Sequence, residues 1–207
     1  MIFKTICIIC ARGGSKGIKN KNIKLVDGKP LIYYPLSVLM LAGIKNILVV
    51  VNTGELNQFK KILQDGKRFG IKIKFVEQSR PRGLADAFII GEKFIEKDKV
   101  ALILGDNFFY GQSFTKKLKD CVKLNSGCKI LIQPEKKPEL YGVAEIGKKN
   151  KIKSLKEKPK RSNSNLAVTG LYFFDNKVIK YSKSLKPSKR NELEIIDLLK
   201  KYKKKNK

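Results

Sequence analysis

Short apolar segments alternate with helical patterns along most of this chain, and this alternation constrains the fold more than any other feature. Strands are expected at 4–10, 46–51, 71–76, 100–105 and 128–133. Helices with glycine at or near their ends are expected at 31–43, 54–66 and 84–95, and a fourth helix is expected at 113–124. Strand–helix alternation predicts an α/β fold, in which helices cover both faces of a mostly parallel sheet.

The C-terminal third has a different pattern. Residues 141–159 predict two antiparallel strands around a polar turn, and 165–175 predict one further strand. The segment 192–207 predicts a helix that ends in a frayed, solvent-exposed basic tail at 200–207. With 207 residues, no internal repeat and no long linker, the chain is expected to form a single domain over 1–207.

The sequence contains no histidine, which excludes Ser-His-Asp and Cys-His catalysis, histidine-ligated zinc and an imidazole base. Chemistry must therefore use Asp, Glu, Lys, Arg, backbone amides or a metal ion. Two of the four cysteines, Cys7 and Cys10, lie in an apolar segment at a spacing of three, which places them on opposite faces of a strand. We interpret them as small buried hydrophobic residues rather than a redox or metal pair.

The formal net charge of +28 raises the question of nucleic-acid binding. Lysine supplies 40 of the 46 basic residues, they are scattered over every segment, and only six are arginine, the usual reader of base edges. We expect no specific nucleic-acid partner, although an anionic small substrate would benefit from the field. No apolar run approaches the roughly 20 residues of a membrane span, and no signal-peptide pattern precedes the first strand. A cytoplasmic protein without a membrane partner is expected.

Three polar segments follow expected strands: "CARGGSKGIKNKN" at 10–22, "EQSRPRG" at 77–83 and "GDN" at 105–107. Ligands of open α/β sheets bind outside the carboxyl ends of the strands, so we expect these segments to converge. The glycines of the first segment have neither P-loop nor dinucleotide-fingerprint spacing. They still allow backbone amides to approach a phosphate, beside the positive charges of Arg12, Lys16, Lys19 and Lys21.

Asp106 stands at the end of a buried strand. A carboxylate there suits Mg²⁺, which takes one or two protein carboxylates and completes its shell with water and phosphates. A side chain that only caps the following turn is the alternative.

Six blocks lie in order between Lys29 and Leu198: "KPLIYYPLSVLMLAGIKNILVV", "GLADAFIIGEKFI", "ALILGDNFFYG", "YGVAEI", "KEKPKRSNSNLAVTGLYFFDN" and "LKPSKRNELEIIDL". Together they resemble the glucose-1-phosphate thymidylyltransferase family of sugar nucleotidyltransferases. The stretch "ARGGSKGIKNKNIKLVDGKP" is instead similar to the N-terminal loop of CMP-sialic acid synthetase, a cytidylyltransferase, whereas the thymidylyl family has a longer loop with a G-G-x-G-T-R pattern.

Both resemblances imply the Rossmann-like nucleotidyltransferase fold, with a small antiparallel sugar-binding portion. They also imply a reaction, in which an oxygen of a sugar 1-phosphate attacks the α-phosphorus of a nucleoside triphosphate and releases pyrophosphate. The later blocks favour dTTP and glucose 1-phosphate. A CTP-dependent enzyme acting on an acidic sugar is the alternative that the first loop keeps open.

The resemblance also implies roles for individual residues. The nucleotide would be bound by Arg12, Gly13, Gly14, Lys16, Lys21, Gln78 and Gly83, of which the last two would read the base. Catalysis would rest on Lys21, Asp106 and Lys158, with Asp106 as the Mg²⁺ ligand. The sugar phosphate would be bound by Asn107, Gly142, Glu157, Val168, Thr169 and Arg190.

One departure concerns the metal. The family carries a second metal-binding aspartate in a "W-L-D-T-G" block, which this sequence lacks, so the chain is expected to be C-terminally short. Asp197 matches the family's "E-L-E-I-T-D" helix instead and is no obvious substitute. Reduced activity, or a binding protein for nucleotides or sugar phosphates that has lost catalysis, is therefore a further alternative. Formation of a homo-oligomer stays open.

Overall fold

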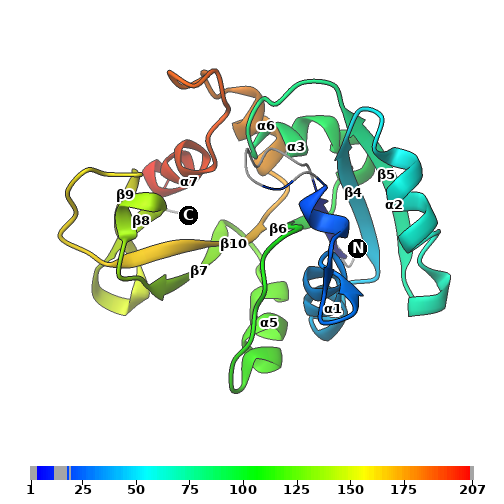
Figure 1. Cartoon of the computed structure of the whole chain (residues 1–207). Helices are drawn as coiled ribbons and strands as arrows, with labels where there is room; N and C mark the ends of the chain where they lie inside the picture. The colour runs from blue at the N-terminus through cyan, green and yellow to red at the C-terminus, as the bar shows by residue number, and fades with distance from the viewer. Residues whose placement is uncertain (1–3, 12–17, 19, 206–207) are drawn as a thin grey trace.

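Four parallel strands form one half of the sheet in the computed structural model, which describes residues 4–11, 18 and 20–205 (Figure 1). The central strand β1 (Thr5–Cys10) pairs with β4 (Asn46–Asn52) on one side and with β6 (Lys99–Leu104) on the other. Strand β5 (Lys72–Gln78) extends this half beyond β4. The strand order β5-β4-β1-β6 brings the carboxyl ends of all four strands to one edge.

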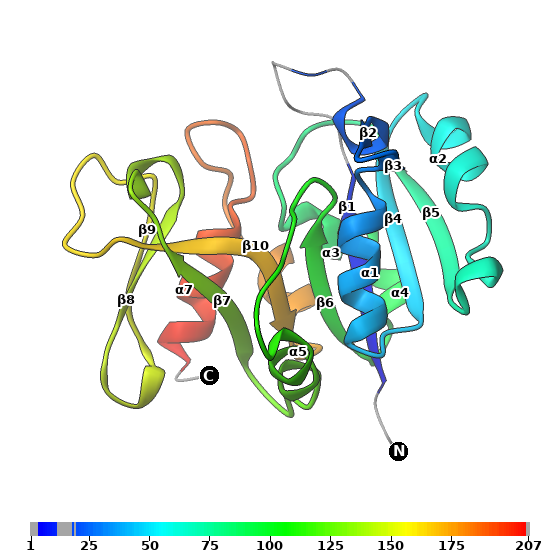
Figure 2. The same ribbon diagram turned by 60° about the horizontal axis from the view of Figure 1, so that its bottom comes forward.

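The other half of the sheet is antiparallel and is organised by β10 (Leu166–Phe174). One edge of β10 pairs with β7 (Cys128–Pro134). The other edge pairs with β6 through residues 171–174 and with β8 (Gly142–Ile146) at Ala167. Strand β9 (Ile152–Glu157) then pairs with β8. Because β6 and β8 share one edge of β10, residues 168–170 lie between them at a gap in the ladder (Figure 2).

Helices cover both faces of the sheet, as predicted from the sequence. One face carries α1 (Tyr33–Leu41), α2 (Leu56–Leu63) and α5 (Phe114–Val122). The other carries α3 (Asp86–Ile90), α4 (Glu92–Ile95), α6 (Val178–Lys183) and α7 (Ile195–Lys204). The remaining short elements are β2 (Leu25–Val26), β3 (Lys29–Pro30) and four 3₁₀ turns, η1 (Lys21–Ile23), η2 (Lys67–Phe69), η3 (Pro138–Leu140) and η4 (Lys148–Asn150).

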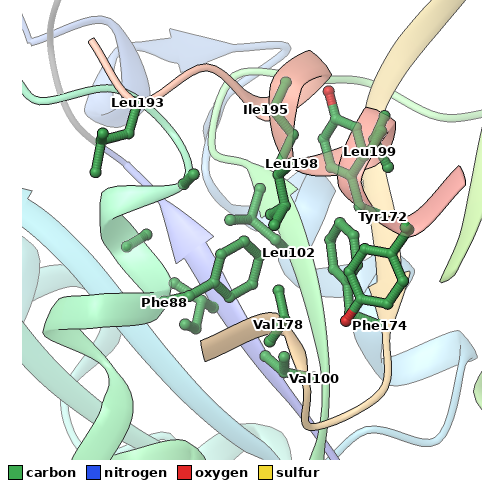
Figure 3. Packing of buried hydrophobic residues seen from close by; sticks show 14 of the residues in the cluster. Phe88, Val100, Leu102, Tyr172, Phe174, Val178, Leu193, Ile195, Leu198 and Leu199 are labelled. Atoms are coloured by element: carbon green, nitrogen blue, oxygen red, sulfur yellow. The ribbon is translucent and has the colours of Figure 1, made fainter. Parts of the chain in front are cut away.

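The two hydrophobic cores follow from the period of two along each strand. In β1, Ile6 and Ile8 face the α7 side of the sheet, whereas Cys7 and Ile9 face the α1 side. Cys7 is fully buried, which raises the pKa of its thiol, and Cys10 packs on the opposite face, as predicted. Figure 3 shows the core on the α7 side, where Phe88 meets Phe174 edge to face with ring centroids 5.2 Å apart.

Three details differ from the sequence-based expectation. The helix expected at 84–95 is divided at Gly91, where a Cβ would lie 2.9 Å from both the carbonyl oxygen of Ala87 and Cδ1 of Ile8, so a larger residue would crowd the preceding turn and the sheet. Helix α6 was not predicted. The tail expected to fray from residue 200 instead continues α7 to Lys204, because Tyr202 is fully buried and holds this turn against the core.

Tyr202 is held by a buried carboxylate. Its hydroxyl donates to Oδ1 of Asp175 at 2.8 Å, and Oδ2 of Asp175 accepts from the backbone nitrogen of Gly127 at 2.7 Å. Burial and the Asp175 carboxylate raise the pKa of the Tyr202 phenol well above its usual range. The contact fastens the last turn of α7 to the end of β10.

The substitution Tyr202→Phe removes this hydrogen bond while keeping the aromatic ring. We expect it to lower the free energy of unfolding by about 1 to 3 kcal/mol, because a buried acceptor loses its partner. Urea denaturation measures the change. Tyr110→Phe is the matched control, since Tyr110 is 93% exposed and its loss should cost almost nothing. Equal effects of the two substitutions would contradict the assignment.

Candidate functional site

The loops after β5 and β6, the turn η1 and the segment before α7 rise from the same edge of the sheet (Figure 2). Two hydrogen bonds join the first of these loops to the last. The backbone nitrogen of Leu193 donates to the oxygen of Arg82, and the nitrogen of Ala85 donates to the oxygen of Leu193. These bonds bring the loop after β5 to the segment before α7, a neighbour that was not among the three segments expected to converge.

Lys21 and Asp106 form an ion pair at this edge. The Lys21 Nζ lies 2.9 Å from Oδ2 of Asp106, and the two side chains are 37% and 34% exposed. Asp106 can reach this position because β6 ends close to β1: a Cβ at Gly105 would lie 2.9 Å from Cα of Ala11. The pair is thus half-open to solvent, with oppositely charged groups that a charged ligand can contact.

Lys21 is positioned by its neighbour Asn22, whose side chain is buried. The Asn22 Nδ2 donates to the carbonyl oxygen of Ala11 at 2.5 Å, and its own backbone oxygen accepts from Ile32 at 2.8 Å. Its Oδ1 accepts no hydrogen bond from the part of the chain that the structure describes. These contacts fix η1 against the end of β1, and so fix the base of the Lys21 side chain.

Asn107 connects Asp106 to β10. In the amide orientation that satisfies both ends, its nitrogen donates to Oδ1 of Asp106 at 3.2 Å and its oxygen accepts from the nitrogen of Gly170 at 3.1 Å. Gly170 leaves no room for a side chain, because a Cβ there would overlap the Asn107 amide and Leu104. Asn107 therefore holds the carboxylate at the gap between β6 and β8.

The same gap contains an irregularity in β10. The register with β7 shifts between Val168 and Tyr172, and the hydroxyl of Thr169 donates to the carbonyl oxygen of Leu131 at 2.9 Å. Val168 is buried in the core. The structure thus gives both residues a part in shaping the strand, and their predicted contact with a sugar stays a prediction.

Across the gap, Arg190 links two glutamates. Its guanidinium donates to Glu194 at 2.9 and 3.2 Å and to Oε1 of Glu157 at 3.1 Å. Glu194 is almost fully buried and also accepts from the hydroxyl of Ser188 at 2.6 Å. The buried Glu194 carboxylate therefore fixes the Arg190 guanidinium, which in turn orients the Glu157 carboxylate.

The two carboxylates influence each other. Burial, followed by the neighbouring Glu194 charge, raises the pKa of Glu157 above its ordinary value of 4.5, while Arg190 and Lys158 act in the opposite direction. Glu157 is paired with Gly142 in the β8–β9 ladder, where a Cβ on the glycine would lie 2.5 Å from Cδ1 of Ile196. Because Gly142 has no side chain, α7 can pack closely against the sheet beside Glu157. Lys158 follows with a positive φ of 40° and an exposed side chain.

On the β5 side, Gln78 and Gly83 lie in different environments. The Nε2 of Gln78 donates to Oδ2 of Asp86 at 2.7 Å, and both side chains are buried. Gly83 has a φ of 92°, and a Cβ there would lie 2.5 Å from the oxygen of Leu193. Glycine is therefore required at this point for the backbone contact that joins the two loops.

The structure brings Lys21, Asp106 and Asn107 together on one side of the gap, and Gly142, Glu157 and Arg190 on the other. Arg12, Gly13, Gly14 and Lys16 lie outside the described residues. Sequence reasoning missed Asn22, Asp86 and Glu194. Each is a polar residue within eight positions of a predicted site residue, but burial, the property that marks them, is not visible in the sequence.

Within the described ranges, no group of three or more Cys, Asp or Glu side chains could hold a metal ion. Asp106 nevertheless fits the type of site that Mg²⁺ uses, because a half-exposed single carboxylate leaves positions for water and phosphate oxygens. Asp197 pairs with Lys200 at 2.9 Å. No helix in the described part of the chain is long and apolar enough to cross a membrane.

The fold is that of a nucleotidyltransferase. The sequence model of the nucleotidyl transferase family matches residues 15–207, and the chain belongs to this family. A curated relative from Neisseria meningitidis, named glucose-1-phosphate thymidylyltransferase, is 50% identical over 91% of this chain and 65% of its own length. A relative of the same name from Mycobacterium tuberculosis is 42% identical over 88% of this chain and 62% of its length. The chain thus spans a little under two thirds of these relatives.

Comparison with solved structures shows the same fold. A Bacillus anthracis protein crystallised with sucrose, provisionally described as a glucose-1-phosphate thymidylyltransferase, superposes with a TM-score of 0.87 at 33% identity, covering 97% of this chain and 83% of that one. An inositol-1-phosphate CTP transferase from T. maritima has a TM-score of 0.78 at 23% identity, covering 98% and 82%. At that identity the second likeness shows the fold alone.

The substitution Arg190→Gln tests the bridge between the glutamates. At about pH 7.5 we expect a loss of about 1 to 3 kcal/mol in the free energy of unfolding, because two ionised carboxylates lose their shared donor. At about pH 4 the loss should be smaller, since protonation removes their repulsion and the raised pKa of Glu157 means that it is protonated there. Urea denaturation of the variant and the wild type at each pH measures both values.

Lys183→Gln is the control, because it breaks an exposed ion pair with Glu92 that should matter little at either pH. A loss for Arg190→Gln that does not shrink on acidification would show that the two carboxylates are not coupled through the guanidinium.

Proposed function

We propose that this chain transfers a nucleotidyl group from a nucleoside triphosphate, with dTTP favoured, to a sugar 1-phosphate, with glucose 1-phosphate favoured. The proposal is supported by relatives at 39–50% identity that are named glucose-1-phosphate thymidylyltransferase. The observation that carries it is the placement of the Lys21–Asp106 pair and the Arg190–Glu157 pair on the two sides of the gap in β10.

The reaction is a substitution at phosphorus. An oxygen of the sugar phosphate forms a bond to the α-phosphorus, the bond from that phosphorus to its bridging oxygen breaks, and pyrophosphate leaves with the electron pair. No proton has to move, which fits a chain without histidine. The protein contributes alignment of the two substrates and stabilisation of negative charge on the phosphates.

The residues divide this work between the two sides. Lys21 contacts the triphosphate oxygens, together with the loop that carries Arg12, Gly13, Gly14 and Lys16. Lys158 binds the phosphate of the sugar phosphate, and the Glu157 carboxylate accepts hydrogen bonds from sugar hydroxyls. Arg190 keeps Glu157 in place and is available to the same phosphate. Gln78 and Gly83 read the base.

Asp106 is the residue that would hold Mg²⁺, with Asn107 fixing the carboxylate. The ion would neutralise charge on the phosphate groups. Lys21, which pairs with the free carboxylate, would turn toward the triphosphate when the ion takes its place. We place the reaction in the cytoplasm, as expected from the sequence.

The direct test is pyrophosphate release with glucose 1-phosphate and Mg²⁺, with dTTP, UTP, CTP, ATP and GTP assayed in parallel. Release with dTTP or UTP supports the proposal. Release with CTP alone would transfer the choice of base to the loop at 11–22. If dTTP raises the melting temperature of the protein but no pyrophosphate appears, the chain is a binding protein and the proposed activity is wrong.

The substitution Asp106→Asn keeps the shape of the side chain and removes its charge. We expect kcat to fall by about 10²- to 10³-fold, because both the ion pair with Lys21 and the carboxylate ligand for Mg²⁺ are lost. Coupled pyrophosphate assays measure kcat, and the melting temperature reports on folding. Asp120→Asn is the control, since Asp120 pairs with Lys123 on the exposed side of α5. Full activity of Asp106→Asn would refute the role of Asp106.

A further inference from the structure

We propose that Glu194 keeps the Glu157 carboxylate available to a sugar, because it restricts the Arg190 guanidinium to a single contact with Glu157. The inference rests on the proposed function and adds a residue to its sugar side, where Glu157 accepts hydrogen bonds from hydroxyl groups. Glu194 acts through Arg190 and is therefore a positioning residue.

The hydrogen bonds of Arg190 are divided unequally between the two glutamates. Its Nε and Nη2 donate to Oε1 and Oε2 of Glu194 at 3.2 and 2.9 Å, so this contact uses both oxygens of the carboxylate. Glu157 receives one hydrogen bond, from Nη2 to Oε1 at 3.1 Å. Glu194 is buried, whereas the Arg190 side chain is 47% exposed. The guanidinium is thus anchored at its inner side by Glu194.

Glu194 itself is fixed by contacts that do not involve the guanidinium. It immediately precedes α7, and its backbone oxygen accepts from the nitrogen of Leu198 at 3.2 Å. The residue before it, Leu193, is bonded through both backbone groups to the loop after β5. The hydroxyl of Ser188 donates to Oε1 of Glu194 at 2.6 Å and accepts from the backbone nitrogen of Arg190 at 3.2 Å. The carboxylate and the backbone of Arg190 are therefore tied to each other through one hydroxyl.

The consequence concerns the second oxygen of Glu157. Within the described ranges, Oε2 accepts no hydrogen bond, because the one that Arg190 donates goes to Oε1. Oε2 lies beside Gly142, where a Cβ would be 3.4 Å away, and the Glu157 side chain is 27% exposed. An ionised carboxylate accepts hydrogen bonds at both oxygens. Oε2 is therefore the acceptor that remains for a sugar hydroxyl.

Loss of the Glu194 charge would change this division. A guanidinium is a planar fork that matches the two oxygens of a carboxylate. With Glu194 neutralised, the charged carboxylate still bonded to Arg190 is that of Glu157, and the guanidinium can turn to it and occupy Oε2 as well as Oε1. A sugar hydroxyl would then have to displace a charge-assisted hydrogen bond. Glu194 thus prevents Arg190 from competing with the sugar.

The experiment measures KM for glucose 1-phosphate by pyrophosphate release with Mg²⁺ and saturating dTTP or UTP, whichever reacts faster. In Glu194→Gln, we expect this KM to rise by about tenfold or more, because the sugar loses a hydrogen bond to a charged group. The KM for the triphosphate should stay unchanged, and kcat should change less than the KM for glucose 1-phosphate, since Glu157 contacts hydroxyls and not the attacking oxygen. A merely structural effect would change both KM values.

Glu192→Gln is the matched control. Glu192 belongs to the same turn and its charge acts on Arg190, but in the part of the chain that the structure describes its side chain accepts no hydrogen bond from the guanidinium. Both KM values should therefore stay at those of the wild type.

A double substitution tests whether Glu194 acts through Arg190. Lysine carries a single ammonium group and cannot fork onto both oxygens of Glu157. In the Arg190→Lys background, Glu194→Gln should therefore raise the KM for glucose 1-phosphate by less than about threefold. An equal rise in both backgrounds would contradict the inference.

An unchanged KM for glucose 1-phosphate in Glu194→Gln, or an equal rise in both KM values, would overturn the inference and leave the proposed function standing. A wild-type protein that releases no pyrophosphate with dTTP or UTP would overturn the proposed function, and the inference with it. If Glu194→Gln does not fold, Glu194→Asp replaces it. The shorter side chain keeps the charge but draws it away from Arg190, so the same selective rise is expected, and its absence would refute the inference.

Discussion

The geometry of the site depends on β10 and its change of partners. Its second half completes the main sheet beside β6, while its first half carries the small antiparallel portion through β7 and β8. Between these halves the register shifts, and the hydroxyl of Thr169 supplies the hydrogen bond to Leu131 at the irregularity. Such bulges bend a strand and end regular pairing.

The charged groups of the site are arranged differently on its two sides. Lys21 and Asp106 form an exposed pair of single charges, which substrates and a metal ion can rearrange at small cost. Arg190 instead lies between two carboxylates, one of them almost fully buried, so that removing it leaves repulsion behind. The first pair can rearrange when a charged group approaches, whereas the second is held rigidly by the buried Glu194 carboxylate.

The order of elements could be predicted from the sequence because β1, β4 and β6 are buried on both faces and consist largely of apolar residues. The pairing of Lys21 with Asp106 agrees with the rule that ligands bind at the carboxyl ends of such strands, whereas Arg190 was expected only from the family resemblance. Helix α6 was missed because it has only six residues, too few for a periodic pattern. Asn22, Asp86 and Glu194 could not be found, since they are distinguished from other polar residues by their burial, which the sequence does not show.

The sequence at 11–30 resembles the loop of a cytidylyltransferase, whereas the blocks at 29–198 resemble the thymidylyltransferase family. Each strand of the parallel half ends in its own loop, so a loop has to match the sheet only at its two ends. For the loop after β1, one junction lies at Asn22, which bonds to Ala11 and accepts from Ile32. Gln78, at the end of β5, pairs with Asp86 of α3, and the bonds that hold Asn22 involve neither residue. The loop after β1 and the loop after β5 are therefore anchored by separate contacts.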